Sequence, residues 1–350
     1  MSAVIETDAL VIGAGPVGLF QVFQLGLQGI AAQVVDVLDE AGGQCIELYA
    51  DKPLYDIPAL PRCTGRELTQ RLLAQIAPFS PCFHFGQQVS ALQCQPDGRW
   101  LAISRQSDGT EQTFLARTVF VAAGVGAFVP KELKIDGLAA FAGRQLFYRL
   151  SPLAQFAGQD VLIVGGEDAA VMHAIALAQP GPHQARRVTV LHRRDTCQAD
   201  AAELSRFAEL RAAGLIQFQA GWVTAIQTQG DRLTGVHITT PTDTTDTLAL
   251  DRLLVCQGIS PKLGPVADWG LDMARKQLCV NPETFATSAP GVFAVGDVVT
   301  YPGKKKLIVC GFHEATLAAF AAAHLLRPQD SGVLQYTSSS ALLQQRLGVN

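Results

Sequence analysis

The chain of 350 residues lacks several features that would assign it to a class at once. It holds eight cysteines but no C-x-x-C pair, and their irregular spacing predicts reduced thiols rather than a disulfide framework. It has no basic tract, and a net charge of −4 gives no indication of a nucleic-acid partner. No window of about 18 uninterrupted apolar residues occurs, so we expect no membrane-spanning helix.

The N-terminus also lacks the pattern of a signal peptide. Glu6 and Asp8 come early, and an apolar run follows them at once. Together with the predicted free thiols, this indicates a cytoplasmic location. The length predicts about two domains. A hydrophobic content of 48% with 17% charged residues is typical of a globular protein.

What the sequence does contain is a glycine motif at its start. Residues 9–18 (ALVIGAGPVG) begin with four apolar residues, typical of a strand buried on both faces, and end in G-x-G-x-x-G spacing. Gly13 permits a tight strand-to-helix turn, Gly15 lets the backbone approach a pyrophosphate, and Gly18 lets the helix pack close to the strand. Pro16 stands at the predicted start of that helix, whose free N–H groups would bind the pyrophosphate.

Asp36 follows a second apolar strand, 18 residues after Gly18. A carboxylate at that place accepts hydrogen bonds from a ribose diol. Strand, glycines, helix, strand and acid together predict a dinucleotide-binding fold. A glycine-rich turn in an ordinary α/β protein is the alternative interpretation.

The same layout starts again at residues 160–170 (DVLIVGGEDAA). Gly165 and Gly166 take the place of the first glycines, and Asp168 and Ala170 follow in the predicted helix. Glu167 stands where the middle glycine is expected. The paired strand ends in His192, Arg193 and Arg194 in place of an acid. Arginines suit a 2′-phosphate, so this half predicts NADP(H), although a solvated strand end would carry the same residues.

The two repeats predict an α/β fold with two Rossmann-like dinucleotide-binding domains. A late apolar strand ends in Gly296 and Asp297 and is followed by an alanine-rich helix predicted over residues 314–326. We expect the first domain to comprise residues 1–126 and 258–330, with the second domain, residues 127–257, inserted in it. Residues 331–350 form a separate polar tail.

Two dinucleotide-binding folds followed by a Gly-Asp pair near the C-terminus, Gly296-Asp297, resemble the two-domain pyridine-nucleotide flavoprotein reductases. In that family the first fold holds FAD, the inserted fold holds NAD(P)H, and the late Asp, here Asp297, contacts the ribityl chain. The absence of a third, interface domain resembles the thioredoxin reductase branch. That branch carries a redox C-x-x-C before the second glycine motif, where this chain has no cysteine.

The whole chain is most similar to ferredoxin–NADP reductases built on the thioredoxin reductase scaffold. The similarity lies in residues 42–49 (GGQCIELY), 52–56 (KPLYD), 122–130 (AAGVGAFVP), 147–149 (FYR), 192–194 (HRR) and 301–314 (YPGKKKLIVCGFHE), and in the tail from Tyr336. Glu167 departs from the family pattern, as do Cys197 and Gln198. All three lie in the NADP half.

The resemblance implies an FAD enzyme that moves electrons between NADPH and ferredoxin or flavodoxin. A hydride passes to flavin N5, and single electrons pass to the carrier. The cofactor supplies this chemistry, so we expect neither a catalytic triad nor a metal site. We expect Tyr49 to stack on one flavin face, although a core tyrosine would look the same in sequence. The other contacts implied for FAD are Gln44, Asp56, Val89, Gly124 and Phe128.

Two further features bear on partners. Lys304, Lys305 and Lys306 form the densest positive run, and an acidic ferredoxin or flavodoxin could dock there, although such a run is more often a solvated loop. His313 and Glu314 are expected to open the helix that faces the flavin.

The resemblance also implies a homodimer in which the tail of one subunit covers the second flavin face of the other. Tyr336 would stack there, with Thr337 and Ser338 at the polar edge of the ring. A frayed chain end is the alternative.

Two other functions remain open from the sequence. One is an NADPH-dependent disulfide reductase that lacks a C-x-x-C of its own, and the other is a non-enzymatic FAD-binding redox sensor. The His-Arg-Arg segment argues against the sensor, which has no use for a nucleotide phosphate site.

Overall fold

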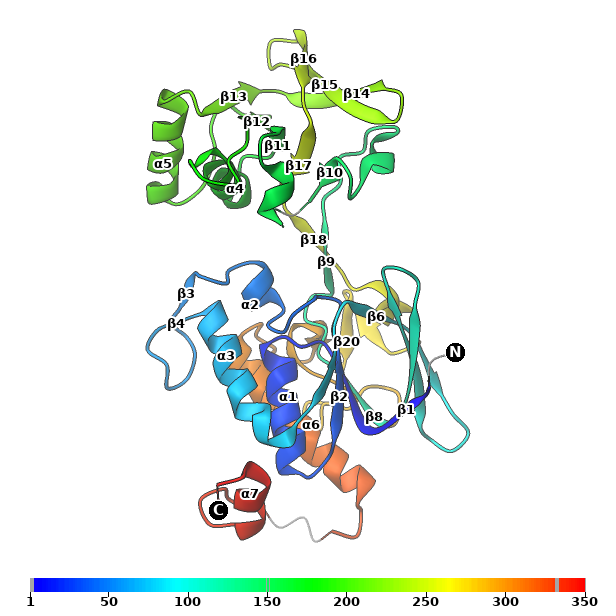
Figure 1. Ribbon diagram of the computed structural model, residues 1–350. Coiled ribbons are helices and arrows are strands. Elements are labelled where there is room, and N and C mark those ends of the chain that lie inside the picture. The colour runs from blue at the N-terminus through cyan, green and yellow to red at the C-terminus, as the bar shows by residue number, and fades with distance from the viewer. Residues whose placement is uncertain (1–2, 149, 151, 331–333, 350) are drawn as a thin grey trace. The chain divides into compact units, whose positions relative to one another are not determined.

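The computed structural model of the chain describes residues 3–148, 150, 152–330 and 334–349, and of residues 127–129 and 259–261 it describes the backbone alone. The chain forms two compact units (Figure 1). Unit 1 comprises Met1–Ala127 and Pro261–Asn350, and unit 2 comprises Phe128–Ser260. The chain passes between them through strands β9 (Ala127–Pro130) and β18 (Ile259–Lys262), which pair with each other. The sequence places these crossings after residues 126 and 257.

Unit 1 is built on a seven-stranded sheet in which six strands follow the order β5-β2-β1-β8-β7-β6. Strand β1 pairs in parallel with β2 and β8, and β7 and β6 continue the sheet as an antiparallel meander. Strand β21 pairs in parallel with the end of β8. The strands are β1 (Ile5–Ile12), β2 (Ala32–Val35), β5 (Cys82–His84), β6 (Gln87–Cys94), β7 (Trp100–Gln106), β8 (Glu111–Val121) and β21 (Val292–Ala294).

Strand β1 shows why this sheet is buried on both faces. Successive side chains of a strand point to opposite faces. Ala9 and Val11 accordingly lie in one apolar cluster, together with residues of three helices, while Leu10 and Ile12 lie in a second cluster on the other face. The run of apolar residues therefore predicts this strand correctly.

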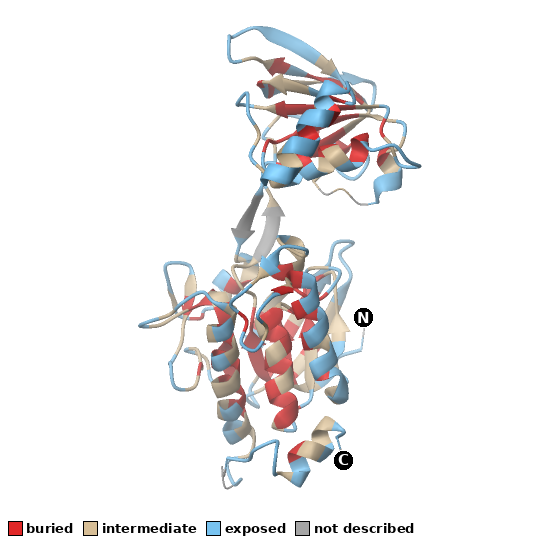
Figure 2. Cartoon of the chain, turned by 90° about the vertical axis from the view of Figure 1, so that its left-hand side faces the viewer, coloured by how far each residue is buried: buried red, intermediate tan, exposed pale blue. Residues whose placement is uncertain are grey.

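Three helices cover the first of these faces: α1 (Pro16–Leu27), α3 (Gly65–Ile76) and α6 (Ile308–Leu326). Helix α1 lies between the other two (Figure 1). Figure 2 shows the buried residues gathered along the inner faces of these helices. At Gly311, an added Cβ would come within 2.3 Å of a methyl carbon of Val17, so α6 can approach α1 this closely only with a glycine there.

Helix α6 corrects one expectation. It begins at Ile308, so His313 and Glu314 lie in its second turn and do not open it. The alanines suggested a start at residue 314 because the first six residues of the helix, 308–313, contain no alanine. By length and apolar composition α6 is also the one helix of the described chain that could cross a membrane, a property that buried core helices share. Glu314 and four alanines of this helix are fully buried, so one face of α6 packs into the core of unit 1.

Unit 2 repeats the parallel layout in a five-stranded sheet of order β10-β17-β11-β12-β13. Its elements are β10 (Leu146–Phe147), β11 (Asp160–Val164), α4 (Asp168–Ala178), β12 (Arg187–His192), α5 (Ala201–Ala212), β13 (Ile216–Ala220) and β17 (Arg252–Val255). A three-stranded antiparallel sheet joins it, made of β14 (Trp222–Gln229), β15 (Arg232–Thr239) and β16 (Thr245–Ala249).

The remaining elements of unit 1 are short. They are α2 (Gln44–Glu47), β3 (Pro53–Leu54), β4 (Cys63–Thr64), β19 (Met273–Ala274), β20 (Gln277–Cys279), β22 (Val299–Thr300) and α7 (Ala341–Leu347), with the 3-10 helices η1 (Ala77–Phe79), η4 (Gly264–Asp268) and η5 (Gly296–Val298). Strands β19, β20 and β22 form one small sheet and β3 and β4 another.

Candidate functional site

The first glycine motif forms a turn in which each glycine has a distinct steric role. A Cβ added at Gly13 would lie 2.4 Å from the carbonyl oxygen of Ala122, and one at Gly18 would lie 1.9 Å from that of Gly13. Both glycines are therefore required by backbone packing. Gly15 differs, because the nearest atom to its added Cβ is the Cα of Gly43, at 3.9 Å.

The space in front of Gly15 lies at the N-terminus of α1. Gly15 is the N-cap of this helix, no side chain caps it, and Pro16 occupies its first turn. Gly43 lies on the other side of this space, with φ of +53°, a conformation that favours glycine. Free N–H groups beside two glycines form a cradle that fits the pyrophosphate of a dinucleotide.

Asp36 follows β2 directly and supports this turn. Its Oδ2 accepts a hydrogen bond from the backbone N–H of Ala14 at 2.5 Å, and its Oδ1 accepts one from Leu38 at 2.8 Å. Burial raises the pKa of this carboxyl, while these backbone hydrogen bonds act in the opposite direction. The backbone carbonyl of Asp36 also accepts from Gln87, which brings the start of β6 and Val89 to the same edge of the sheet.

Tyr49 lies just after α2 and interacts with two acids, Asp56 from the following segment and Asp297 from a distant part of the chain. Its hydroxyl is 3.6 Å from Sγ of Cys45. Burial is the main cause of a raised Tyr49 pKa, and charge interactions with Asp297 and Asp56 contribute to it. The structure therefore brings together the residues expected at the flavin ring and its ribityl chain.

Gln44 and Gly124 also lie side by side, since a Cβ at Gly124 would be 3.1 Å from Nε2 of Gln44. The side chain of Phe128 lies outside the described part of the chain, and only its place in β9 is known. Unit 1 thus places nine of the predicted contacts around one end of its sheet, namely Gly13, Gly15, Pro16, Gly18, Gln44, Tyr49, Asp56, Gly124 and Asp297.

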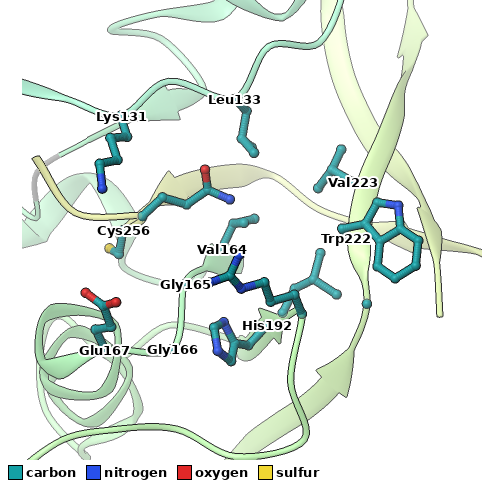
Figure 3. A pocket seen from close by; sticks show the side chains of 14 residues that line it. Lys131, Leu133, Val164, Gly165, Gly166, Glu167, His192, Trp222, Val223 and Cys256 are labelled. Atoms are coloured by element: carbon teal, nitrogen blue, oxygen red, sulfur yellow. The ribbon is translucent and has the colours of Figure 1, made fainter. Parts of the chain in front are cut away.

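Unit 2 contains a cavity of about 330 Å³ at its own glycine turn (Figure 3). Gly165, Gly166, Glu167, His192 and Arg193 line it, as the sequence predicts for a nucleotide site. Arg194 is exposed and does not line the cavity. Asp168 lies in the first turn of α4, and Ala170 is fully buried.

His192 has a packing role that the sequence did not reveal. A Cβ at Gly166 would meet the imidazole ring at 2.4 Å, so the ring lies directly on the glycine turn. The pKa of His192 is lowered, first by burial and then by the positive charges of Arg193 and Arg194. Burial and the two arginines thus both favour the neutral form of this imidazole.

Glu167 is the N-cap of α4 and lines the cavity. Gly258 lies near both this carboxylate and Lys131. A Cβ added at Gly258 would be 4.0 Å from Oε2 of Glu167 and 3.9 Å from Nζ of Lys131. Figure 3 shows this carboxylate and this ammonium group directed toward the same part of the cavity. The negative charge at the helix N-terminus opposes a pyrophosphate there, and Lys131 offsets it in part.

Sequence reasoning missed several lining residues, namely Lys131, Leu133, Trp222, Val223, Cys256 and Gln257. Three of them follow the carboxyl ends of parallel strands, which meet at the ligand edge of such sheets. Cys256 and Gln257 follow β17, and Trp222 follows β13 after one glycine. This signal was present in the sequence but was not used. Burial raises the pKa of the Cys256 thiol to about 12, so at neutral pH it is protonated.

The side chain of Lys304 is buried, whereas a docking residue must be exposed at the surface. Its side chain is only 6% exposed, and Nζ forms an ion pair with Glu314 at 2.5 Å. The expectation that all three lysines present a charged surface is therefore wrong for Lys304, because the buried carboxylate draws it inward. Lys305 and Lys306 are exposed.

The tail lies away from the flavin cradle of its own chain. Helix α7 contacts α1, and Arg346 in α7 donates a hydrogen bond to the carbonyl of Leu27, the last residue of α1. Tyr336 lies beside the start of α7, where its carbonyl accepts from Ser340, and its side chain is 64% exposed. The 12 residues of α1 rise 1.5 Å each, so the contact of the tail with Leu27 lies about 18 Å along the helix from Gly15.

The eight cysteines carry no disulfide in the structure, and its described residues include no group of three or more metal-ligating side chains.

Comparison with known proteins agrees with this geometry. The family model described as pyridine nucleotide-disulphide oxidoreductase matches residues 7–319. A protein of Paracidovorax citrulli named ferredoxin–NADP reductase is 56% identical, over 99% of this chain and 97% of its own. One of the same name from Albidiferax ferrireducens is 54% identical, over 99% and 96%.

Solved structures show the same fold at low identity. The bacillithiol disulfide reductase of Staphylococcus aureus aligns with a TM-score of 0.64 at 15% identity, covering 93% of this chain and all of that one. The thioredoxin reductase of T. acidophilum aligns with a TM-score of 0.62 at 20% identity, covering 92% and 99%. These matches confirm the predicted fold of two dinucleotide-binding domains. The chain belongs to the pyridine nucleotide-disulphide oxidoreductase family.

Proposed function

We propose that this protein is a ferredoxin–NADP reductase, an FAD enzyme that transfers electrons between NADPH and ferredoxin or flavodoxin. The main support is a sequence identity above 50% to reductases of that name, over nearly the full length of both chains. The geometry supports it with a cradle in unit 1 and an arginine-lined cavity in unit 2. We place its activity in the cytoplasm, consistent with eight free thiols.

Unit 1 would hold FAD. Its pyrophosphate would lie between Gly15 and Gly43 at the N-terminus of α1. Asp36 holds the turn through Ala14, and the remaining lone pairs of its carboxylate would accept the ribose hydroxyls. Val89 would supply backbone hydrogen bonds to the adenine. Bound FAD supplies the exchange between hydride and single-electron transfer.

The ring end of FAD would lie near Tyr49. This side chain would stack on one face of the flavin, with its hydroxyl held toward Cys45. Asp297 would contact the ribityl chain, with Gln44, Asp56 and Gly124 as its neighbours.

Unit 2 would hold NADPH in the cavity of Figure 3. Arg193, which lines the cavity, would bind the 2′-phosphate with a bidentate guanidinium contact, and Arg194 would add charge from outside. Trp222, 44% exposed at the cavity wall, offers an aromatic face to the adenine.

We propose that the active form is a homodimer in which the tail of one subunit covers the flavin of the other. The tail packs at the far end of α1 from the cradle of its own chain, so Tyr336 is free to serve a partner's site. Tyr336 would stack on the second flavin face, with Thr337 and Ser338 at the polar edge of the ring. The nicotinamide must then displace Tyr336 before hydride transfer, so the tail acts as a gate.

Deleting residues 331–350 should leave FAD bound but alter its visible absorption bands. It should also expose the reduced flavin to oxygen and raise the NADPH oxidase rate relative to carrier reduction. Tyr336→Ser should reproduce the spectral change with the rest of the tail present. Absorption spectra and the two rates, measured in parallel, check this. Wild-type spectra and rates in both variants would show that the tail does not reach a flavin.

Lys305 and Lys306 are exposed and are proposed to dock an acidic carrier. The double variant Lys305→Ala/Lys306→Ala should raise the KM for ferredoxin several-fold, and added salt should abolish the difference, because exposed charges are screened. The KM for NADPH serves as the internal control. An equal rise in both KM values would contradict a docking role.

The experiment that tests the proposed function is anaerobic reduction of the FAD-loaded protein by NADPH, followed by addition of ferredoxin, flavodoxin or thioredoxin. Rapid reoxidation by ferredoxin or flavodoxin is expected, and none by thioredoxin. Reoxidation by thioredoxin alone would indicate a disulfide reductase. Absence of reduction by NADPH would indicate a protein that binds FAD without this activity.

A further inference from the structure

Glu314 is a carboxylate with no exposed surface, in the middle of unit 1. Its Oε2 accepts a hydrogen bond from the backbone N–H of Gly296 at 2.6 Å. Its Oε1 accepts one from the hydroxyl of Tyr301 at 2.8 Å and one from Nζ of Lys304 at 2.5 Å. A buried charge is retained only when it is paired and hydrogen-bonded in this way.

The first of these bonds fixes the turn that carries Asp297. Gly296 begins turn η5 with φ of +84°, and a Cβ added there would lie 3.5 Å from a methyl carbon of Val17, in the first turn of α1. The side-chain amide of Gln277 donates to the carbonyls of Asp297 and Val299, at 3.1 and 2.8 Å. Glu314 and Gln277 therefore both hold the backbone of this turn, one through an N–H and the other through two carbonyls.

The other two bonds connect this turn to the lysine segment. Tyr301 and Lys304 lie between η5 and α6, and the backbone N–H of Lys304 donates to the carbonyl of Tyr301. Lys304 therefore enters the core, while the next two lysines remain exposed. One carboxylate thus fixes both the turn and the inner end of the positive segment.

We infer that Glu314, Lys304 and Tyr301 form a positioning unit for the flavin, with Glu314 holding Asp297 in place through Gly296. None of the three is a catalytic residue. The inference rests on the proposed placement of FAD beside Asp297. Because the pair is buried, its two charges act on their surroundings with weak screening and cancel each other. If either Glu314 or Lys304 loses its charge, the field of the remaining charge acts on the flavin.

This arrangement predicts opposite shifts of the flavin reduction potential. Reduction adds negative charge to the flavin, so an unbalanced positive charge favours it and an unbalanced negative charge disfavours it. Glu314→Gln leaves Lys304 unbalanced and should raise the potential. Lys304→Met leaves Glu314 unbalanced and should lower it. The double variant carries no charge there and should return the potential toward the wild-type value.

The affinity for FAD distinguishes the effect of the hydrogen bond to Gly296 from the effect of the charge of Glu314. Glu314→Leu leaves the N–H of Gly296 without its acceptor and should raise the Kd of the apoprotein for FAD on the order of tenfold. Glu314→Gln keeps an acceptor for Gly296 and should retain most of the affinity. The exposed carboxylate Glu283 provides the matched control, since Glu283→Gln should change neither Kd nor potential.

The measurements are FAD titration of each apoprotein by fluorescence and redox titration of each loaded protein. Shifts of the same sign in the two single variants, or an unchanged Kd in Glu314→Leu, would overturn the inference. If Glu314→Leu does not fold, the potentials of Glu314→Gln, Lys304→Met and their double variant still decide it. A wild-type protein that binds no FAD would contradict the proposed function instead.

Discussion

Replacing Gly15 by Val is expected to weaken FAD binding strongly and leave the fold intact. Gly15 has φ of −69° and ψ of 178°, which any L-residue adopts without strain. Its added Cβ meets no atom closer than 3.9 Å, so the folded apoprotein has room for it. That room is where the pyrophosphate would lie. Displacing the phosphates loses charge-assisted hydrogen bonds of roughly 1.5–3 kcal/mol each, and affinity should fall by about 100-fold or more.

The measurements are the flavin content of the purified variant, the Kd for FAD and the thermal unfolding of the apoprotein. Gly15→Ala should give a smaller loss in the same direction. Gly18→Ala is the contrasting variant, because its Cβ would lie 1.9 Å from the carbonyl oxygen of Gly13 and should destabilise the apoprotein itself. Normal FAD affinity in Gly15→Val would show that the pyrophosphate binds elsewhere.

The second large effect concerns the choice between NADPH and NADH. Arg193 lines the cavity of unit 2, and Arg194 follows it on the exposed side. A guanidinium–phosphate contact contributes roughly 1–3 kcal/mol, so Arg193→Ala/Arg194→Ala should lower the ratio of kcat/KM for NADPH over NADH by about 5- to 150-fold. Arg193→Ala alone should account for most of this loss, because Arg194 does not line the cavity.

Steady-state kinetics with both nucleotides check this, and kcat/KM for NADH is the control that should stay constant. Glu167→Gly tests the opposite charge in the same cavity. It removes a negative charge from the N-terminus of α4 and should tighten NADPH and NADH alike. An unchanged ratio in the double arginine variant would place the 2′-phosphate away from this strand end.

Much of the site could be predicted from the sequence because its signals are local. The glycine spacing fixes a turn geometry within ten residues, and the apolar runs before it predict the buried strands β1 and β11. Asp36 and Arg193 each end the next strand of a repeated unit, so their places follow from the parallel topology. These features need no knowledge of distant contacts.

Other parts of the site depend on contacts between segments far apart in the chain. Lys131 and Leu133 follow β9, where the chain enters unit 2, and only the fold brings them to the nucleotide cavity beside residues 164–167. His192 lines the nucleotide cavity, as the sequence predicts, but its ring also packs on Gly166, a contact that the sequence did not indicate. No local pattern carries such information.

The amino-acid sequence by itself determined the two dinucleotide-binding folds, because glycine spacing and strand hydrophobicity act within one βαβ unit. Only the tertiary structure decided which of the three lysines is buried and which are exposed. In sequence Lys304, Lys305 and Lys306 are equivalent, but the first is buried against Glu314 and the others are exposed. The reason is that a carboxylate buried in α6 requires a cation, and only the fold brings residue 304 within 2.5 Å of it.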